Sequence, residues 1–419
     1  MKILLITYYW PPAGGSGVQR WVKFVKYLQE FGVTPIVYVP ENPSYPTQDN
    51  SLLAEVPAGV TVLKQPIRTL QDRFSFAKKE TGKKQAHTSN GGVLSWIRGN
   101  FFIPDPKISW VQPSVNYLKS YLKEHPVDAI ISSGPPHSMH LIALALQQQT
   151  GVKWVADFRD PWTGLYYNKE FRMHRLVQKK HQKLEQKVLE SADLILTVSA
   201  TLQKEFAKTA KKVRVVSNGY DDEVSPSKER MLDSSFSIAH IGLLPKQSNP
   251  LVLWQVLAAL CKESPEFSKD LKICLTGTVH EDAIASIRAA GLEKYLKHQT
   301  YVPHAAAIVL QQQAQVLLLV LPNTTNIAGV VTGKIFEYIT AKRPILAIGP
   351  KEGDLDLLLQ ETATGTLVGF EDAVGLRAEI LQLYAKFKEG NTGVTPRNIA
   401  QYHRRKLTEK LAEHLKEIL

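Results

Sequence analysis

Cysteine is scarce in this 419-residue sequence, which contains only Cys261 and Cys274. Neither has the spacing of a metal-binding or CxxC pair, so a zinc finger and a disulfide framework are excluded and a reducing compartment is indicated. Long apolar runs are missing too, since none approaches the ~20 residues of a membrane span. The segment Met1–Ile6 has one lysine and leads into Tyr-Tyr-Trp, which predicts a first strand rather than a signal peptide. We therefore expect a cytoplasmic protein.

Acidic residues are fewer than basic ones: the sequence has 39 aspartates and glutamates and 51 lysines and arginines, which gives a net charge of +12. Hydrophobic content of 44% and charged content of 21% are typical of a soluble globular protein, and the length predicts two or three domains. The sequence has no helix-turn-helix, zinc-finger spacing or RNP-type aromatic motif, so nucleic acid is not an expected partner. The positive charge suits an anionic membrane surface or phosphorylated substrates better.

The most informative stretch of the sequence runs from Thr332 to Pro344. Before it, Val316–Leu321 predicts a buried parallel strand, and residues 323–331 form a loop of small and polar residues. Helical periodicity begins at Lys334 and stops at Arg343-Pro344, ahead of a second apolar strand. A strand, a small-residue loop and a helix N-terminus together predict an anion site, because free N–H groups and the helix dipole face the loop.

Two charged residues on this helix extend the prediction from an anion to a nucleotide. Lys334, which follows Thr332 and Gly333, adds a full positive charge beside the phosphate position. Glu337 lies one turn later on the same face, where its carboxylate could accept hydrogen bonds from the vicinal diol of a ribose. The plainer alternative is an exposed i,i+3 ion pair worth a few tenths of a kcal/mol. This segment alone does not decide between the two.

A glycine-rich turn follows the first predicted strand. Gly15 and Gly17 would let the backbone approach a ligand closely at the carboxyl end of that strand, before an amphipathic helix from Val18 to Leu28. The spacing is not that of a dinucleotide clamp, because Arg20 occupies the position of the last glycine, so a dehydrogenase is disfavoured. A tight turn without any ligand would use glycines in the same way.

Charged side chains follow two further strands of the first half. Asp157, Arg159 and Asp160 come directly after an apolar strand at 153–156, and His137 lies in the turn after the strand at 128–132. Ligand crevices of α/β proteins form at the carboxyl ends of strands, so these four residues are the catalytic candidates. A structural ion pair and a solvated histidine are the alternatives.

Residues 64–113 interrupt the alternation of strands and helices. Lys78-Lys79 and Lys83-Lys84 flank a polar stretch that predicts a mobile loop, and Val93–Ile103 mixes aromatic with basic residues. This mixture suits a segment that dips into lipid headgroups, although ordinary packing at the sheet edge would use the same aromatics. A long basic helix is predicted over 168–190.

The second half repeats the α/β alternation after a polar linker. The expected strands are 236–241, 271–276, a short one near 300–302, 316–321, 345–348 and 367–368. The expected helices include 251–262, 282–290, one through 357–360 that Asp354 caps in place of a metal site, and 373–388. We predict domains at 1–217 and 218–396, with an amphipathic tail helix over 397–419.

Several motifs together resemble the GT-B glycosyltransferases, with family 4 and its relatives of bacterial envelope polysaccharide assembly as the nearest match. The resemblance covers essentially the whole chain. The motifs that carry it are Pro-Pro-Ala-Gly-Gly-Ser-Gly from residue 11, Ala-Asp-Phe-Arg-Asp-Pro-Trp from residue 156, Tyr-Val-Pro-His from residue 301 and the stretch 332–346.

The resemblance implies two Rossmann-like doubly wound domains facing a central cleft, with the C-terminal helix crossing back to the first. It also implies transfer of a sugar from a nucleotide-sugar donor to a glycan or lipid-linked acceptor, with retention and with neither metal nor cofactor. The acceptor would lie against the first half, at the inner membrane face, and the donor against the second. The residues expected at the donor are Gly15, Gly17, Gly242, Lys246, His304, Gly329, Thr332, Gly333, Lys334 and Glu337.

Three positions depart from the family pattern. Gly329 replaces a second glutamate, Arg159 replaces a histidine, and Ser248 replaces an arginine, which leaves Lys246 as the nearest cation. Backbone N–H groups of residues 328–331 are a hypothetical substitute for the missing glutamate.

Two other functions therefore stay open. Asp157, Asp160, His137 and His304 would suit the proton abstraction of a nucleotide-sugar epimerase, which shares the two-domain architecture. The departures from the family pattern would suit a nucleotide-sugar-binding protein that has lost catalysis.

Overall fold

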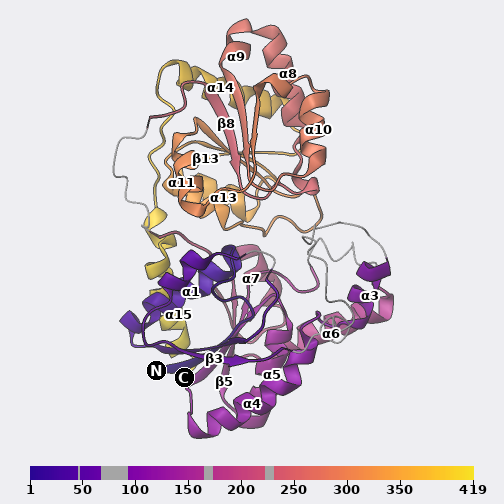
Figure 1. The fold of residues 1–419 in the computed structure, drawn as a ribbon, viewed down its shortest axis with the longest axis vertical. Helices are drawn as coiled ribbons and strands as arrows, with labels where there is room; N and C mark the ends of the chain where they lie inside the picture. Colours follow the sequence, from indigo (N-terminus) through magenta and orange to yellow (C-terminus); the bar gives the residue numbers. More distant parts are fainter. Residues whose placement is uncertain (46–47, 68–92, 165–172, 222–230) are drawn as a thin grey trace, which may run out of the picture. The chain divides into compact units, whose positions relative to one another are not determined.

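The structure, a computed structural model, describes residues 1–45, 48–67, 93–164, 173–221 and 231–419. The chain forms two compact units, Met1–Ser217 with Arg404–Leu419 and Asn218–His403. Each unit is built on one parallel sheet with helices packed around it (Figure 1). The predicted pair of doubly wound Rossmann-like domains is therefore confirmed.

The first unit has a seven-stranded sheet in the order β3-β2-β1-β4-β5-β6-β7. Its strands are β1 Lys2–Ile6, β2 Thr34–Pro40, β3 Thr61–Gln65, β4 Ala129–Gly134, β5 Lys153–Phe158, β6 Leu194–Thr197 and β7 Val213–Val215. Its helices are α1 Ser16–Leu28, α3 Val93–Phe101, α4 Val111–Glu124, α5 Ser138–Thr150, α6 Arg175–Ser191, α7 Ala200–Phe206 and α15 Arg404–Lys416.

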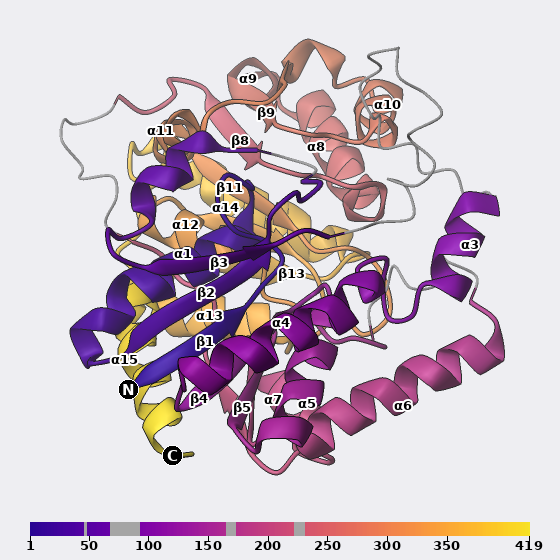
Figure 2. The ribbon, with the colours of Figure 1, turned by 60° about the horizontal axis from the view of Figure 1, so that its bottom comes forward.

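Both faces of this sheet are buried. Ile3 and Leu5 point into an apolar cluster with α1 and α15, while Leu4 and Ile6 point into the opposite cluster with α4 and α5. Successive side chains of a strand alternate between faces, so a strand covered on both sides reads as an uninterrupted apolar run. Figure 2 shows α1 and α15 on one side of the sheet and α4 and α5 on the other.

The second unit has a six-stranded sheet in the order β10-β9-β8-β11-β12-β13. Its strands are β8 Phe236–Ile241, β9 Leu271–Thr276, β10 Leu296–Gln299, β11 Val316–Val320, β12 Ile345–Ile348 and β13 Gly365–Val368. Its helices are α8 Leu251–Glu263, α9 Pro265–Asp270, α10 Glu281–Ala289, α11 His304–Gln313, α12 Lys334–Thr340, α13 Asp354–Thr362 and α14 Ala373–Lys388.

The strand order of the second sheet reverses between β8 and β11. From β8 the chain adds strands β9 and β10 toward one edge of the sheet, and from β11 it adds β12 and β13 toward the other edge. Ligands of open α/β sheets bind at the carboxyl ends of the strands beside such a reversal. The helix α12 follows β11 directly and begins at Lys334. The fold therefore brings the stretch singled out in the sequence to the switch point of its sheet.

Two predicted elements are displaced. The short strand expected near 300–302 lies at Leu296–Gln299, where three of the four residues are exposed at the sheet edge, so no apolar run marks it. The tail helix begins at Arg404 rather than 397, because Asn398 is left-handed with φ 53° and His403 is extended.

Of the predicted membrane-facing insert, residues 68–92 with their four lysines lie outside the described residues, as do residues 168–172 of the predicted basic helix.

The C-terminal helix α15 packs on α1, and its buried residues complete one face of the first core. Leu411 on α15 is fully buried. We expect Leu411→Ala to lower the free energy of unfolding by about 2–5 kcal/mol, because a cavity remains where the side chain packed. Urea unfolding of the full chain measures the loss. The exposed neighbour Lys410→Ala is the control, and equal midpoints for both variants would show that α15 does not stabilise the first unit.

Candidate functional site

The helix α12 is fixed to the second sheet by its apolar side and by one hydroxyl. Ile335, Phe336 and Ile339 are buried, as their spacing predicts. The Tyr338 hydroxyl accepts a hydrogen bond of 2.9 Å from the backbone N–H of Ile241, the last residue of β8. These contacts hold the buried side of α12 against the carboxyl end of β8 and leave Lys334 and Glu337 on its half-buried side.

The Lys334 side chain lies directly over the turn that follows β8. Its Nζ is 3.1 Å from Nε2 of His240 and donates to the carbonyl oxygen of Leu243 at 3.3 Å. Gly242, with φ +121°, leaves the space that the lysine occupies, since a Cβ built there would lie 3.0 Å from both Cε and Nζ. Any other residue at 242 would be strained and would push the lysine away.

Burial acts on both groups of this contact in the same direction. His240 is 1% exposed, and burial followed by the nearby ammonium lowers its pKa to about 3, so the ring is neutral. Burial also lowers the pKa of Lys334 to about 8, and the carboxylate of Glu337 partly offsets this effect. Desolvation disfavours the charged form of each. The lysine is nevertheless an ammonium at neutral pH.

Glu337 is held by a second buried residue. Gln311 on α11 is 2% exposed, and its Nε2 donates a hydrogen bond of 3.1 Å to Oε2 of Glu337. This contact fixes the carboxylate one turn beyond Lys334. Neither His240 nor Gln311 was a candidate from the sequence. A polar residue in a largely apolar strand could have pointed to His240. Gln311 is one of three consecutive glutamines, and nothing in the sequence distinguishes it from the other two.

The other predicted donor residues lie around this pair in different ways. Thr332 and Gly333 lead directly into α12, and the Thr332 hydroxyl is buried with no hydrogen-bond partner in the described part of the chain. Gly329 is buried in the loop before them, and His304 is the first residue of α11. Lys246 pairs with Asp282 at 3.0 Å and is largely exposed, while Ser248 is buried.

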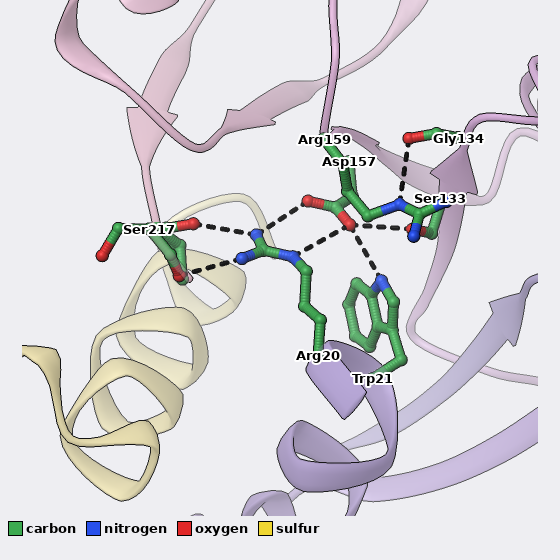
Figure 3. Close-up of polar contacts among 8 residues, drawn as sticks. Arg20, Trp21, Ser133, Gly134, Asp157, Arg159 and Ser217 are labelled. Atoms are coloured by element: carbon green, nitrogen blue, oxygen red, sulfur yellow. Dashed lines mark hydrogen bonds and ion pairs between the residues drawn. The ribbon is translucent and has the colours of Figure 1, made fainter. Parts of the chain in front are cut away.

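In the first unit, Asp157 is the centre of a buried hydrogen-bond network (Figure 3). Its carboxylate accepts from Arg20 at 2.9 Å, from the Trp21 indole at 2.8 Å and from the Ser133 hydroxyl at 2.9 Å. Arg20 also donates to the carbonyl oxygens of residues 216 and 217. Burial would raise the pKa of Asp157, but the Arg20 guanidinium holds it below its ordinary value. This carboxylate ties α1 to the ends of β4, β5 and β7.

Arg159 and Gly17 lie against each other. The arginine donates to the carbonyl oxygens of Gly134, at 3.2 Å, and Pro135. Its guanidinium lies where a Cβ on residue 17 would be, so a larger residue there would have to displace the arginine. Gly15 adopts φ +99° and precedes α1.

The two remaining catalytic candidates differ in their surroundings. His137 is 5% exposed and stacks on Trp162 with ring centroids 4.7 Å apart. Burial lowers its pKa, and neither ring nitrogen has a hydrogen-bond partner among the described residues. It is a core residue rather than a solvated one. Asp160 is half-buried, and burial raises its pKa.

The described ranges contain neither a candidate metal cluster nor a candidate membrane-spanning helix. No group of three or more His, Cys, Asp or Glu side chains there could hold a metal ion. No helix in the same ranges has the length and apolar character to cross a bilayer.

Comparison with known proteins identifies the class. A model of Glycosyltransferase Family 4 matches residues 15–224, which is half of the chain. The chain belongs to that family, and with its two Rossmann-like units it is a GT-B glycosyltransferase, as the sequence predicts. No curated protein sequence matches it.

Several solved structures share the fold. The apo form of the lipopolysaccharide outer core galactosyltransferase WaaB has a TM-score of 0.62 and 14% identity, and the match covers all of both chains. Anabaena HepE in complex with UDP-glucose has a TM-score of 0.58 and 14% identity, covering 100% of this chain and 97% of that one. A putative UDP-N-acetylglucosamine 2-epimerase from Listeria monocytogenes has a TM-score of 0.55 and 10% identity, covering 99% and 97%.

The network around Asp157 generates a stability prediction. Asp157→Asn leaves the buried Arg20 charge uncompensated and should lower the free energy of unfolding by about 3–5 kcal/mol at pH 7. The pKa of Asp157 is lower in the folded than in the unfolded protein. Its contribution to the free energy of unfolding is therefore complete above the pKa of the unfolded state, about 3.9, and is lost as the pH falls through the pKa of the folded state. The difference between wild type and variant should stay constant from pH 8 to 5 and narrow below pH 4.

Urea unfolding at several pH values measures this difference. Asp160→Asn is the matched control, because burial already disfavours the charge of Asp160 and its removal should cost little. If the two variants lost equal stability, Asp157 would have no special structural role.

Proposed function

We propose that this glycosyltransferase moves a sugar from a nucleotide-sugar donor to a glycan or lipid-linked acceptor of envelope polysaccharide synthesis, with retention and without a metal ion. The observation that carries the proposal is the pair Lys334 and Glu337 at the switch point of the second sheet. Each is held by a buried neighbour, His240 and Gln311 respectively. A solved structure of the same fold that contains UDP-glucose supports a nucleotide-sugar donor.

The chemistry requires negative charge to be stabilised on the leaving nucleotide. As the bond to the diphosphate breaks, the sugar becomes oxocarbenium-like and charge builds on the phosphate oxygens. The Lys334 ammonium would supply the compensating charge that a metal ion supplies elsewhere. Glu337 would accept hydrogen bonds from the ribose hydroxyls and thereby set the position of the diphosphate. The departing phosphate itself would take the acceptor proton, so no separate base is needed.

The epimerase alternative has less support from the geometry. Proton abstraction from a sugar ring needs a carboxylate or imidazole free to receive the proton. Asp157 instead accepts from Arg20 and Trp21, and His137 is stacked in the core. Two of the four epimerase candidates are thus held within the fold, and the alternative depends on Asp160 and His304 alone, so transfer is the better supported function.

The acceptor side of the proposal concerns a surface that we call the α3–α6 surface. On α3, the side chains of Trp96, Ile97 and Phe101 are exposed, and Phe101 is 69% exposed. The carboxamide oxygen of Asn100 accepts a 2.7 Å hydrogen bond from the backbone of His174, so α3 ends beside the start of α6 (Figure 2). On α6, Leu176 is exposed, together with the cations Arg175, Lys179, Lys180, Lys183 and Lys187.

Exposed aromatics beside a row of cations suit an anionic membrane surface. The aromatic side chains would enter the headgroup region while the cations attract anionic lipids. A lipid-linked acceptor lies in such a surface. We therefore place the enzyme peripherally on the inner face of the cell membrane.

Donor binding tests the first part of the proposal. Screening UDP-, GDP-, ADP- and CMP-sugars by thermal shift identifies the donor, since a bound ligand raises the unfolding temperature. Glu337→Ala and Lys334→Ala should each raise the donor dissociation constant about tenfold or more, because charged hydrogen bonds worth about 1.5–3 kcal/mol are lost. Calorimetric titration, in the presence of a chelator, measures both constants.

The matched controls are Glu371→Ala and Lys342→Ala, which change exposed residues of the same unit. Unchanged donor affinity in the Glu337 variant would remove the basis of the proposal. Incubation with donor and no acceptor separates the alternatives: an altered sugar on intact nucleotide would identify an epimerase.

Vesicle binding tests the second part. Replacing Trp96 and Phe101 together with serine should weaken binding to phosphatidylglycerol vesicles about tenfold or more, because each aromatic loses about 1.5–3 kcal/mol of apolar burial at most. Sedimentation of protein with vesicles measures the partition. The control replaces Val374 and Leu381, exposed apolar residues of the second unit, with serine. If the two double variants bind equally, the α3–α6 surface is not the membrane contact.

A further inference from the structure

His240 is a buried polar residue near the end of the largely apolar strand β8, where its ring has a definite set of neighbours. Its Nδ1 is 3.0 Å from the carbonyl oxygen of Leu318 on β11. Its Nε2 is 3.1 Å from Nζ of Lys334 and 3.2 Å from the carbonyl oxygen of Leu243. The ring therefore spans the two strands between which the order of the sheet reverses, and one of its nitrogens faces the lysine.

Only one assignment of protons satisfies all of these groups. A neutral imidazole has one N–H and one lone pair. Nδ1 faces the Leu318 carbonyl, so Nδ1 must carry the proton and donate it. Nε2 then has the lone pair and accepts from the Lys334 ammonium, while the Leu243 carbonyl accepts a second N–H of the same ammonium. A protonated ring would instead place two cations 3.1 Å apart.

We propose that His240 is a positioning residue whose neutral ring fixes the Lys334 ammonium for the diphosphate of the donor. The inference rests on the proposed function, in which Lys334 is the cation at the diphosphate. An ammonium has three N–H donors, and among the described residues His240 and Leu243 engage two of them, so the third can be donated to a phosphate oxygen. A lysine side chain is otherwise flexible, so holding it before the donor arrives lowers the entropy lost on binding.

The same contact sets how Lys334 responds to pH. The titratable groups that act on it are His240 from β8 and Glu337 from its own helix, while the neutral Gln311 from α11 holds Glu337. With the pKa of Lys334 lowered to about 8, the ammonium predominates below pH 8 and is lost above it. Donor affinity should therefore be constant at lower pH and fall about tenfold per pH unit above 8, until the pKa of the bound state is reached.

Two substitutions isolate the role of the ring. His240→Phe keeps an aromatic ring but removes the acceptor, so the ammonium loses a stabilising hydrogen bond and its pKa should fall by about one pH unit. His240→Gln offers a side-chain carbonyl near the position of Nε2 and should restore most of the wild-type behaviour. A purely structural role would lower the unfolding temperature in both variants without shifting the titration of Lys334.

The titration of Lys334 is measured directly in the free protein by competitive acetylation at a series of pH values, followed by mass spectrometry of the peptide that contains it. The exposed Lys342 in the same unit is the internal control, and its titration should be the same in every variant. A midpoint that moves down in His240→Phe and returns in His240→Gln supports the inference. A midpoint that is identical in wild type and His240→Phe overturns it.

Donor binding provides the second readout. At pH 7.5, lowering the pKa of Lys334 from about 8 by one pH unit cuts the ammonium fraction about threefold. His240→Phe should therefore raise the dissociation constant of the donor found by the screen about threefold or more, and His240→Gln should restore it. The two proposals can fail separately. If no nucleotide sugar binds the wild type while the Lys334 midpoint shifts as expected, the positioning contact stands and the proposed function falls. If the donor binds wild type and His240→Phe equally at every pH, the positioning role falls and the proposed function stands.

Discussion

A half-buried ammonium needs neutral acceptors around it, and this requirement shapes the carboxyl end of the second sheet. The Lys334 ammonium is partly desolvated where α12 meets β8. The His240 ring and the Leu243 carbonyl oxygen accept hydrogen bonds from it in place of water. The ring can do so only while it is neutral, a state ensured by its burial and by the nearby ammonium, which together lower its pKa. The space for the lysine depends in turn on Gly242 having no side chain.

The backbone around this contact is correspondingly tight. The N–H of Gly242 donates to the Thr276 carbonyl at 2.7 Å, and a Cβ on Gly277 would lie 2.5 Å from the carbonyl oxygen of Gly242. Both glycines have a positive φ that other residues rarely adopt. The turn after β9 can pack this closely on the turn after β8 because Gly277 has no side chain at the point of contact.

The first unit handles buried charge in a different way. Asp157 accepts from three side chains, and Arg20 divides its donors between that carboxylate and two backbone carbonyls. The effect of this network is to fix α1 against the ends of three strands. In the described part of the chain, Lys334 by contrast has two acceptors for its three N–H donors, His240 and Leu243. The arginine is thus tied into the fold of its unit, while the lysine is the cation that we propose for a ligand.

The sequence was informative wherever a local pattern has a single structural solution. The strand Ile345–Ile348 and the helix Ala373–Lys388 were predicted with their observed bounds, because burial on both faces and helical periodicity leave clear patterns. The edge strand Leu296–Gln299 was missed because exposure on one side removes the apolar run. Lys334 and Glu337 became candidates because an i,i+3 pair after a strand and a small-residue loop is itself a local pattern.

The sequence by itself therefore determined the α/β alternation, the glycine turns and the charged pair on α12, since each depends on residues close together in the chain. Only the tertiary structure decided what holds that pair: His240 is 94 residues away from Lys334, Gln311 is 26 from Glu337, and Arg20 is 137 from Asp157. Contacts of this kind are set by the order of the strands and by which polar groups become buried together. No local pattern of residues records that order.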